Sequence, residues 1–276
     1  VSAMGKTTNA LEQVVHSFFK NKKQFPQDLQ NVREDHHRII EDLFGSESAV
    51  ISQRVNVLFD GVLTFLNTTD IKEYSLVYDQ VVSVGELVST TIISAYMDSE
   101  GMENTWLDAR ECIKTDAYFR DANLYWTDTE AAIQQSVNGK STLISQGFIG
   151  STSNGLTTTL GREGSDYSAA IFAHALGADS VTIWKDVPGV LNGDPRKFSD
   201  TVLLDQISYR EAIELAFYGA SVIHPKTLQP LQRKEIPLYV KSFENPQNNG
   251  TAVSKGKRLY PEVPCYIVKN DQTLLK

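Results

Sequence analysis

The chain has 276 residues, 41% of them hydrophobic, which is enough for one large α/β domain or two lobes with a sizeable core. Its formal net charge of −8 argues against a nucleic-acid or anionic-membrane partner held by bulk electrostatic attraction, whereas a nucleotide needs only local positive groups. No run of 18 apolar residues predicts a membrane span, and Cys112 and Cys265 lack metal-binding or redox spacing. We expect a cytoplasmic protein with two free thiols and no metal site built from its own side chains.

The N-terminal residues predict the end of a strand, a loop and the start of a helix. The sequence begins at Val1 without a methionine, so we expect an upstream segment. Gly5-Lys6-Thr7 matches the end of a phosphate-binding P-loop, whose first glycine would lie before Val1. Thr8 is also suited to cap the helix that follows. The residues alone leave both interpretations open, although no apolar run ending in Asp supports the P-loop.

Residues 9–79 predict a helical layer or insertion. Their apolar residues recur with the 3.6-residue period of a helix, and Pro26 and Gly45 interrupt the pattern. The next stretch, 78–85, predicts a strand that ends at Gly85, and Glu86 then opens a helix that runs to Met97. A glutamate in such a place usually interacts with the helix dipole.

Strands and helices alternate through the rest of the chain. Apolar runs predict strands at 105–109, 143–150, 180–184 and 236–240. Helices are predicted to start at Asp128 and to span 167–176 and 227–234. A further helix is predicted to start at a capping box made by Ser208 and Glu211. The polar stretch 245–257 predicts a hairpin turn or loop, and 264–268 a last strand or linker. The alternation across 142–241 predicts an α/β fold with a mainly parallel sheet covered on both faces.

A glycine-rich turn at 161–166 is the strongest candidate for a binding site. Gly161 and Gly164 allow a ligand to approach the backbone, and the N-terminus of the following helix favours a phosphate or a carboxylate. Arg162 adds a planar guanidinium that suits either anion. A turn of this kind often serves only to cap a helix. Here, however, the strand 180–184 leads into the polar loop 185–190, and ligands of α/β proteins bind at the carboxyl ends of parallel strands.

Several motifs, taken together and in this order, resemble the aspartate kinases of the amino acid kinase superfamily over residues 1–241. They are Thr-Thr-Thr-Leu-Gly-Arg-x-Gly-Ser-Asp, then Asp-Val-Pro-Gly-Val, Asp194-Pro195-Arg196 and Gly219-Ala220-Ser221-Val222-Ile223-His224-Pro225. The resemblance implies a three-layer α/β/α sandwich and one catalytic domain, 1–276. It implies an aspartate-side lobe at 1–150, with the helical insertion at about 9–79, and a nucleotide-side lobe at 151–276. No regulatory ACT region is expected within this chain.

The resemblance also implies an activity: transfer of the γ-phosphoryl group of ATP, with Mg²⁺, to the β-carboxylate of L-aspartate. The product, 4-phospho-L-aspartate, is the first intermediate in lysine, threonine and methionine biosynthesis. A carboxylate is already nucleophilic, so the enzyme needs to position two anions and neutralise charge rather than supply a general base. The resemblance further implies a homo-oligomer in the intact protein.

The implied residue roles divide between the two substrates. Aspartate is expected to bind Thr8, Glu86, Arg162 and Ser165, with Glu86 holding its amino group and Arg162 a carboxylate. Asp166 is expected to organise a catalytic lysine and the phosphate groups, so that Asp166 and Arg162 are the catalytic candidates. The nucleotide is expected to lie against Gly161, Gly164, Asp186, Arg196 and Lys226.

Three features depart from the family pattern. The N-terminal Lys-Phe-Gly-Gly-Thr-Ser segment, which carries a phosphoryl-stabilising lysine, should lie upstream of Val1, so the chain alone is expected to be inactive. Ser221 stands where many relatives have a nucleotide-contacting lysine, for which Lys226 or Lys241 are candidates. Glu163 replaces a glycine usual in the turn and is expected to point away from bound phosphate.

Other functions compete with this interpretation. One is another kinase of the superfamily, acting on glutamate, N-acetylglutamate or a nucleotide. A second is a non-catalytic amino-acid-binding relic of the fold, favoured by Ser221 and the missing lysine. The third is a P-loop NTPase, which the residues before Val1 would distinguish.

Overall fold

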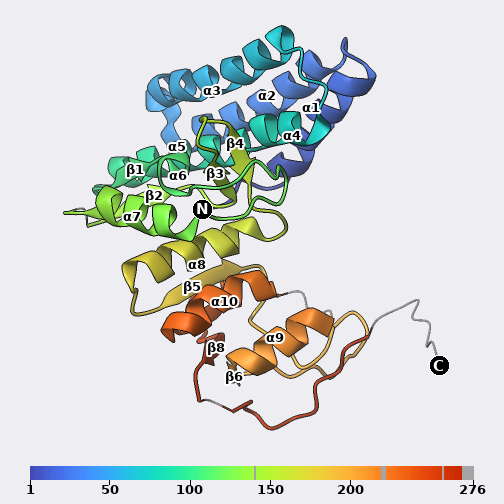
Figure 1. The fold of residues 1–276 in the computed structure, drawn as a ribbon, viewed down its shortest axis with the longest axis vertical. Helices are drawn as coiled ribbons and strands as arrows, with labels where there is room; N and C mark the ends of the chain where they lie inside the picture. Colours follow the sequence, from blue (N-terminus) through green and yellow to red (C-terminus); the bar gives the residue numbers. More distant parts are fainter. Residues whose placement is uncertain (140, 219–221, 257, 269–276) are drawn as a thin grey trace. The chain divides into compact units, whose positions relative to one another are not determined.

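The structure is a computed structural model that describes residues 1–139, 141–218, 222–256 and 258–268 (Figure 1). It divides into two compact units, Val1–Ser165 and Asp166–Lys276. The sequence suggested a lobe boundary after residue 150, and the assignment of one lobe to each substrate stays a prediction. The motif residues 219–221 lie outside the described residues.

Helices dominate the first unit. They are α1 (Thr7–Lys20), α2 (Phe25–Phe44), α3 (Ser48–Thr68), α4 (Tyr74–Val82) and α5 (Val84–Ser99), with a short 3-10 turn, η1 (Gly45–Glu47), between α2 and α3. Their buried faces carry the periodic apolar residues of the sequence, such as Leu11, Val14 and Phe59. The helical insertion near the N-terminus is therefore confirmed.

The strand predicted at 78–85 is wrong. This stretch belongs to α4 and α5, which are separated only by Ser83. Val81, Val82 and Val84 are buried among the neighbouring elements. β-branched residues favour strands on average, but packing overrides that weak preference when a segment is buried on several sides.

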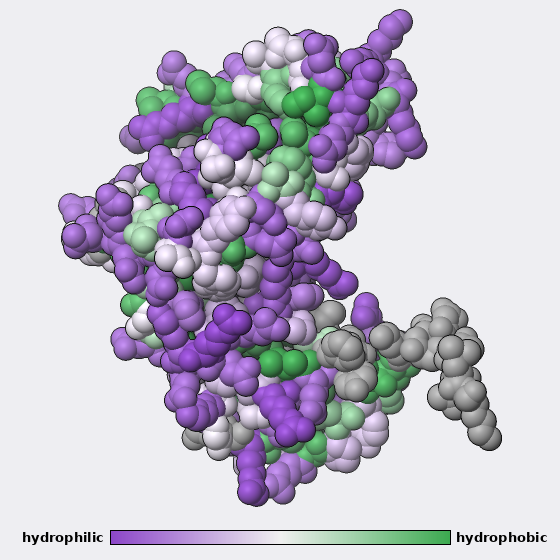
Figure 2. All heavy atoms as spheres, viewed as in Figure 1, coloured by the Kyte–Doolittle hydropathy of each residue, from purple (hydrophilic) through white to green (hydrophobic). Residues whose placement is uncertain are grey.

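Two stretches, Phe25–Thr68 and Tyr74–Ser99, are long and apolar enough to cross a membrane by length and composition alone. In the first, the chain turns at Gly45, whose φ is +51°, and α2 and α3 pack against each other. In the second, 78% of the apolar 18-residue window is buried within the structure. Hydrophilic side chains cover most of the face shown in Figure 2. These features are typical of helices in a globular protein.

The strands of the first unit form two small sheets. β1 (Thr105–Leu107) and β2 (Leu143–Ser145) are parallel, and β3 (Ile149–Ser151) and β4 (Thr157–Thr159) are antiparallel. Two helices, α6 (Ala109–Cys112) and α7 (Trp126–Val137), accompany them. The strand predicted at 143–150 is thus interrupted at 146–148, where Phe148 has a φ of +70°.

The second unit contains one four-stranded sheet in the order β5-β7-β8-β6. Its strands are β5 (Val181–Lys185), β6 (Gln206–Ser208), β7 (Leu238–Ser242) and β8 (Thr251–Ser254), and its helices are α8 (Gly164–Leu176), α9 (Tyr209–Tyr218) and α10 (Pro225–Lys234). The β5–β7 and β6–β8 pairs are parallel, and β7–β8 forms the hairpin expected near residues 245–257. The α/β class and the mainly parallel pairing are confirmed.

Local signals in the second unit behave as the sequence predicted. The Ser208 N–H and hydroxyl both donate to Glu211 Oε2 at 2.7 Å, and the Glu211 N–H donates back to Ser208 Oγ at 3.2 Å. This is the predicted capping box at the start of α9. Gly177, with a φ of +59°, ends α8.

Asn192 fastens the last described segment to the second unit. Its side-chain Nδ2 donates to the Pro264 carbonyl at 2.9 Å, and its Oδ1 accepts the Val202 N–H at 2.7 Å. Its carbonyl oxygen accepts the Tyr266 N–H at 2.6 Å. Residues 264–268 form no strand; they are held by this buried amide.

Candidate active site

The glycine-rich turn leads into α8, which begins at Gly164, one residue before Ser165. Gly161 and Glu163 have φ values of +81° and +54°, and the Gly164 N–H donates to the Gly161 carbonyl at 3.0 Å. A Cβ on Gly161 would lie 2.4 Å from Asp121 Oδ1, so only glycine fits there. Arg162 is exposed, and Ser165 and Asp166 lie in the first turn of the helix. A turn that opens a helix is therefore confirmed, with the predicted binding residues on it.

Glu163 differs from the expectation of a residue that simply points away. Its side chain is half-buried, and its Oε2 is buried with no hydrogen-bond partner in the described part of the chain. The positive φ explains part of this, because it directs the side chain out of the ordinary helical path.

Asp79 holds the strand that leads into the turn. Its carboxylate accepts the Thr159 N–H and hydroxyl, both at 2.8 Å, and the Arg120 N–H at 3.0 Å. Burial raises the pKa of Asp79 to about 6, while these hydrogen bonds favour the ionised form. Sequence reasoning missed this residue, although a lone carboxylate within an apolar run was an available signal.

Glu86 is a deeply buried carboxylate in the first turn of α5. Its side chain is 2% exposed, and its Oε1 accepts the Ala3 N–H at 3.4 Å. Its Oε2 is buried and has no hydrogen-bond partner among the described residues. Burial raises the pKa of Glu86 to about 8. A carboxylate in such a place is well suited to receive a cationic ligand.

The N-terminal segment lies beside Glu86. A Cβ on Gly85 would be 3.0 Å from Thr7 Cγ2 and 3.2 Å from Ala3 Cβ. The Thr7 hydroxyl donates to the Met4 carbonyl at 2.7 Å, and the cap of α1 is Lys6, without a side-chain bond. The alternative role of Thr8 as helix cap is therefore wrong, because α1 begins one residue before it. Thr8 is half-buried in the first turn.

The same segment leads to Ser165. The Gly147 N–H donates to the Val1 carbonyl at 2.8 Å, and a Cβ on Gly147 would lie 2.7 Å from the Ser165 Cα. The first residues of the chain thus contact both the start of α5 and the break before β3. Through these contacts the structure brings the Thr8 segment, Glu86 and Ser165 into one region of the first unit.

The second unit carries an ion pair between β5 and the first turn of α8. Lys185, the last residue of β5, places its Nζ 2.8 Å from Asp166 Oδ2. The two side chains are only 21% and 15% exposed, so solvent screens this pair less than a surface pair. Sequence reasoning noted that β5 ends in a polar loop but assigned Lys185 no role.

A cavity of about 460 Å³ follows the end of β5. Its lining includes Lys185, Asp186, Asn192, Arg196 and Tyr266. Asp186 is exposed, and Arg196 binds Asp194 through its Nε at 3.0 Å and its Nη2 at 2.9 Å. These contacts lower the pKa of Asp194 and raise that of Arg196. Asp186 and Arg196 therefore line the same cavity, and their contacts with a nucleotide stay a prediction.

Lys226 is placed differently. Its Nζ lies 5.1 Å from the centre of the Tyr167 ring, which is a cation–π distance, and the lining of the 460 Å³ cavity includes neither residue among those described. Its predicted contact with the nucleotide stays a prediction.

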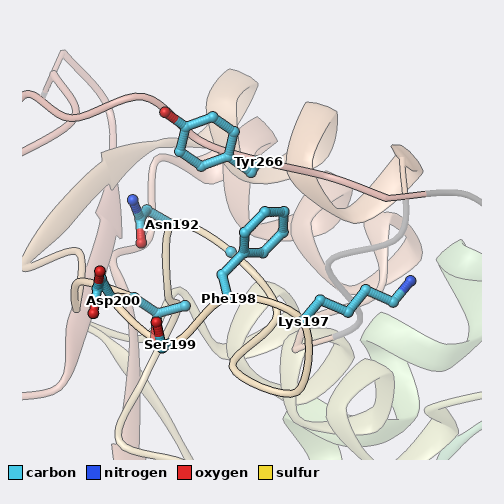
Figure 3. A pocket seen from close by; sticks show the side chains of 8 residues that line it. Asn192, Lys197, Phe198, Ser199, Asp200 and Tyr266 are labelled. Atoms are coloured by element: carbon cyan, nitrogen blue, oxygen red, sulfur yellow. The ribbon is translucent and has the colours of Figure 1, made fainter.

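A smaller pocket of about 280 Å³ adjoins this cavity and shares Asn192, Gly193 and Tyr266 with it. Figure 3 shows Phe198 and Tyr266 reaching toward each other across the pocket. Their ring centres are 5.5 Å apart. The aromatic rings form one wall that a flat ligand could stack on.

A glycine turn that opens a helix and a polar cavity at the carboxyl end of a parallel strand are both features of nucleotide-binding α/β proteins. Residues 1–242 match the model of the Amino acid kinase family, and the chain belongs to this family. The P-loop interpretation of Gly5-Lys6-Thr7 is accordingly abandoned.

Within the family, the chain is similar to aspartokinases. It is 36% identical over 229 residues to lysine-sensitive aspartokinase 3 of Escherichia coli, covering 82% of this chain and 51% of that protein. It is 33% identical to chloroplastic aspartokinase 1 of Arabidopsis thaliana, covering 100% of this chain and 50% of that protein. The structure of E. coli aspartokinase III in complex with aspartate and ADP superposes with a TM-score of 0.85 at 33% identity, over 93% of this chain and 57% of that one. The chain thus spans about half the length of these relatives.

Proposed function

We propose that the chain forms the kinase part of an aspartate kinase, which transfers the γ-phosphoryl group of ATP to the β-carboxylate of L-aspartate. The product would be 4-phospho-L-aspartate, the first intermediate toward lysine, threonine and methionine. Glu86 carries the proposal: a buried carboxylate oxygen with no hydrogen-bond partner among the described residues needs a cation, and the α-ammonium group of an amino acid supplies one. The related structure that holds aspartate and ADP supports the same pair of ligands.

The aspartate side of the proposal uses four residues. Glu86 holds the amino group, and Thr8 lies on the segment that contacts the start of α5. Arg162, exposed on its turn, pairs with a carboxylate of the substrate, and Ser165 donates from the first turn of α8. These groups orient aspartate; its own carboxylate is the nucleophile.

The nucleotide side uses the glycine turn and the cavity at the end of β5. Gly161 and Gly164 are the proposed phosphate contacts in the turn that opens α8, and Asp186 and Arg196 belong to the cavity lining. Lys226 is a further candidate for this side. Asp166 orients a lysine and, through it, the phosphates.

Mg²⁺ accompanies ATP in reactions of this kind, where it neutralises charge on the phosphates. Within the described ranges, no group of three or more His, Cys, Asp and Glu side chains is placed to hold a metal ion. Asp186 and Asp194 both line the cavity. This set fits an ion held mainly by phosphate oxygens and supported by one or two carboxylates.

The proposal is tested by aspartate-dependent ADP release with hydroxylamine trapping of the acyl phosphate, on the protein expressed with its natural flanking sequence. Aspartyl hydroxamate is the expected product. Arg162→Ala should raise the KM for aspartate by about tenfold or more, because a charged hydrogen bond is lost. Arg210→Ala, which removes an exposed guanidinium paired with Glu214 on α9, is the matched control and should leave that KM unchanged.

Other outcomes would redirect the assignment. ADP release without any need for aspartate would indicate another acceptor, as in other kinases of the superfamily. Binding of aspartate without turnover would favour the amino-acid-binding relic. An unchanged KM for aspartate in Arg162→Ala would contradict the assignment of Arg162 to the substrate site.

We further propose a cytoplasmic homo-oligomer. Bacterial aspartokinases among the relatives support the compartment, whereas the plant relatives are named chloroplastic. Expression of a fluorescent fusion tests the compartment, and sedimentation of the purified protein tests the oligomeric state.

A further inference from the structure

Lys185 is the most enclosed cation in the lining of the 460 Å³ cavity, as far as that lining is described. Arg196 is the other charged donor there, but its side chain is 86% exposed and its guanidinium is engaged by Asp194 at two nitrogen atoms. Lys185, in contrast, is 21% exposed and is anchored at the carboxyl end of β5. A cation in this environment interacts more strongly with an anionic ligand than one in open solvent.

The ion pair fixes where the ammonium group lies. Its partner, Asp166, is in the first turn of α8, two residues after Gly164. The first turn of a helix also favours a negative charge at the place of Asp166. The 2.8 Å contact between Lys185 Nζ and Asp166 Oδ2 is an ion pair without hydrogen-bond geometry among the described residues, so the N–H donors of the ammonium group remain available to a ligand.

The two lysines suggested by the sequence are placed less well. Lys226 lies over the Tyr167 ring, and Lys241 lies 6.0 Å from the centre of the Trp184 ring. Neither is among the described lining residues of the cavity that contains Asp186 and Arg196.

We infer that Lys185 is a phosphate-binding lysine of this kinase and that Asp166 positions it. This inference rests on the proposed nucleotide site and adds the residue that contacts the terminal phosphates. In the transfer, a β-carboxylate oxygen of aspartate forms the new P–O bond, and the bond between the γ-phosphorus and the bridging oxygen breaks. ADP leaves with that electron pair. Lys185 keeps its proton throughout and neutralises charge on the leaving and transferring groups.

The test compares Lys185→Met with Lys185→Arg in the protein with its natural flanking sequence. Lys185→Met should weaken ADP binding by about tenfold or more while AMP binding changes by less than about twofold, because only the terminal phosphates lose a charged donor. The kcat should fall by a similar or larger factor with the KM for aspartate unchanged. Lys185→Arg should restore most of the ADP affinity. Lys255→Met, which removes an exposed lysine paired with Glu235, is the matched control.

A double variant separates binding from folding. Lys185→Met leaves the Asp166 carboxylate unpaired and should lower the melting temperature for that reason alone. Asp166→Asn with Lys185→Met removes both charges, which should recover the melting temperature but not the preference for ADP over AMP. If the ion pair had only a structural role, the double variant would recover both the melting temperature and the preference for ADP over AMP.

The outcomes distinguish this inference from the proposed function. If the wild-type enzyme is active and Lys185→Met leaves the ratio of ADP to AMP affinity unchanged, only the role of Lys185 is overturned. If that ratio changes in Lys226→Met instead, the role belongs to Lys226. A wild-type protein that neither binds ADP nor forms aspartyl phosphate would overturn the proposed function first, and the inference with it.

Discussion

At the scale of single residues, Glu86 shows how burial prepares a side chain for a ligand. The carboxylate lies in the first turn of α5 with one oxygen unpartnered in the described part of the chain, and burial raises its pKa from 4.5 to about 8. Between these two pH values the folded protein retains a proton that the unfolded chain has lost. The contribution of Glu86 to the free energy of unfolding therefore falls as pH rises through this window and is constant above it.

The same residue predicts how aspartate binding depends on pH. The α-ammonium group favours the ionised form of Glu86, so the affinity for aspartate should rise from pH 6 to 8, by up to about tenfold per pH unit, and then level off. Calorimetric titration at several pH values measures this. Glu86→Gln should bind aspartate weakly and lose the pH dependence, whereas Glu47→Gln, at an exposed position, should behave like the wild type. A flat profile in the wild-type protein would contradict the assignment of Glu86.

The site residues were predictable from the sequence to different extents. Arg162, Ser165 and Asp166 follow from a glycine turn that opens a helix, because the turn and the helix stop at Gly177 are local signals. The role of Lys185 was not predictable, since its partner Asp166 is brought to the end of β5 only by tertiary packing. Asp79 was not predicted for the same reason: the three groups that donate hydrogen bonds to its carboxylate come from two distant segments.

At the scale of elements, the break between β2 and β3 is held open by close packing rather than by a turn signal. Gly147 touches the backbone of Ser165, and Gln146 donates to Thr90 Oγ1 and accepts the Ala109 N–H, both at 2.7 Å. The apolar run 143–150 contains no information about these distant partners, so the sequence predicted one continuous strand. Likewise the valines near Gly85 predicted a strand, and their burial among helices decided otherwise.

This packing predicts opposite effects for two glycine substitutions. Gly147→Ala would place a methyl group 2.7 Å from the Ser165 Cα, which must displace the start of α8, so we expect a loss of about 1–3 kcal/mol in stability and a larger loss in activity. Gly61→Ala lies within α3 with open space around it and should stabilise the protein by about 0.5–1 kcal/mol. Chemical denaturation of both variants measures these changes. Equal stability of Gly147→Ala and the wild type would show that the contact is absent in solution.

At the scale of the whole molecule, the chain consists of two units with different proposed ligands. The buried Glu86 belongs to Val1–Ser165, and the cavity with Lys185 belongs to Asp166–Lys276. A ligand stabilises the native state of the region it binds, and local opening reports that effect.

Hydrogen exchange should therefore assign the two ligands separately. ADP should slow amide exchange mainly in peptides from 181–196, and aspartate mainly in peptides from α5. The turn at 161–165 carries proposed contacts to both ligands, so either ligand should protect it. L-alanine, which lacks the second carboxylate, is the control for aspartate. Protection by ADP confined to α5 would contradict the assignment of the nucleotide to the second unit.

The amide of Asn192 also bears on how the protein ages in storage. The chain contains four Asn-Gly pairs, at Asn138, Asn154, Asn192 and Asn249, and such pairs deamidate readily because glycine lets the next backbone nitrogen attack the side-chain amide. Three of these asparagines are exposed, whereas Asn192 is buried and held at both ends of its side chain. Old preparations should therefore gain negative charge at the three surface positions first and keep the segment around Tyr266 in place.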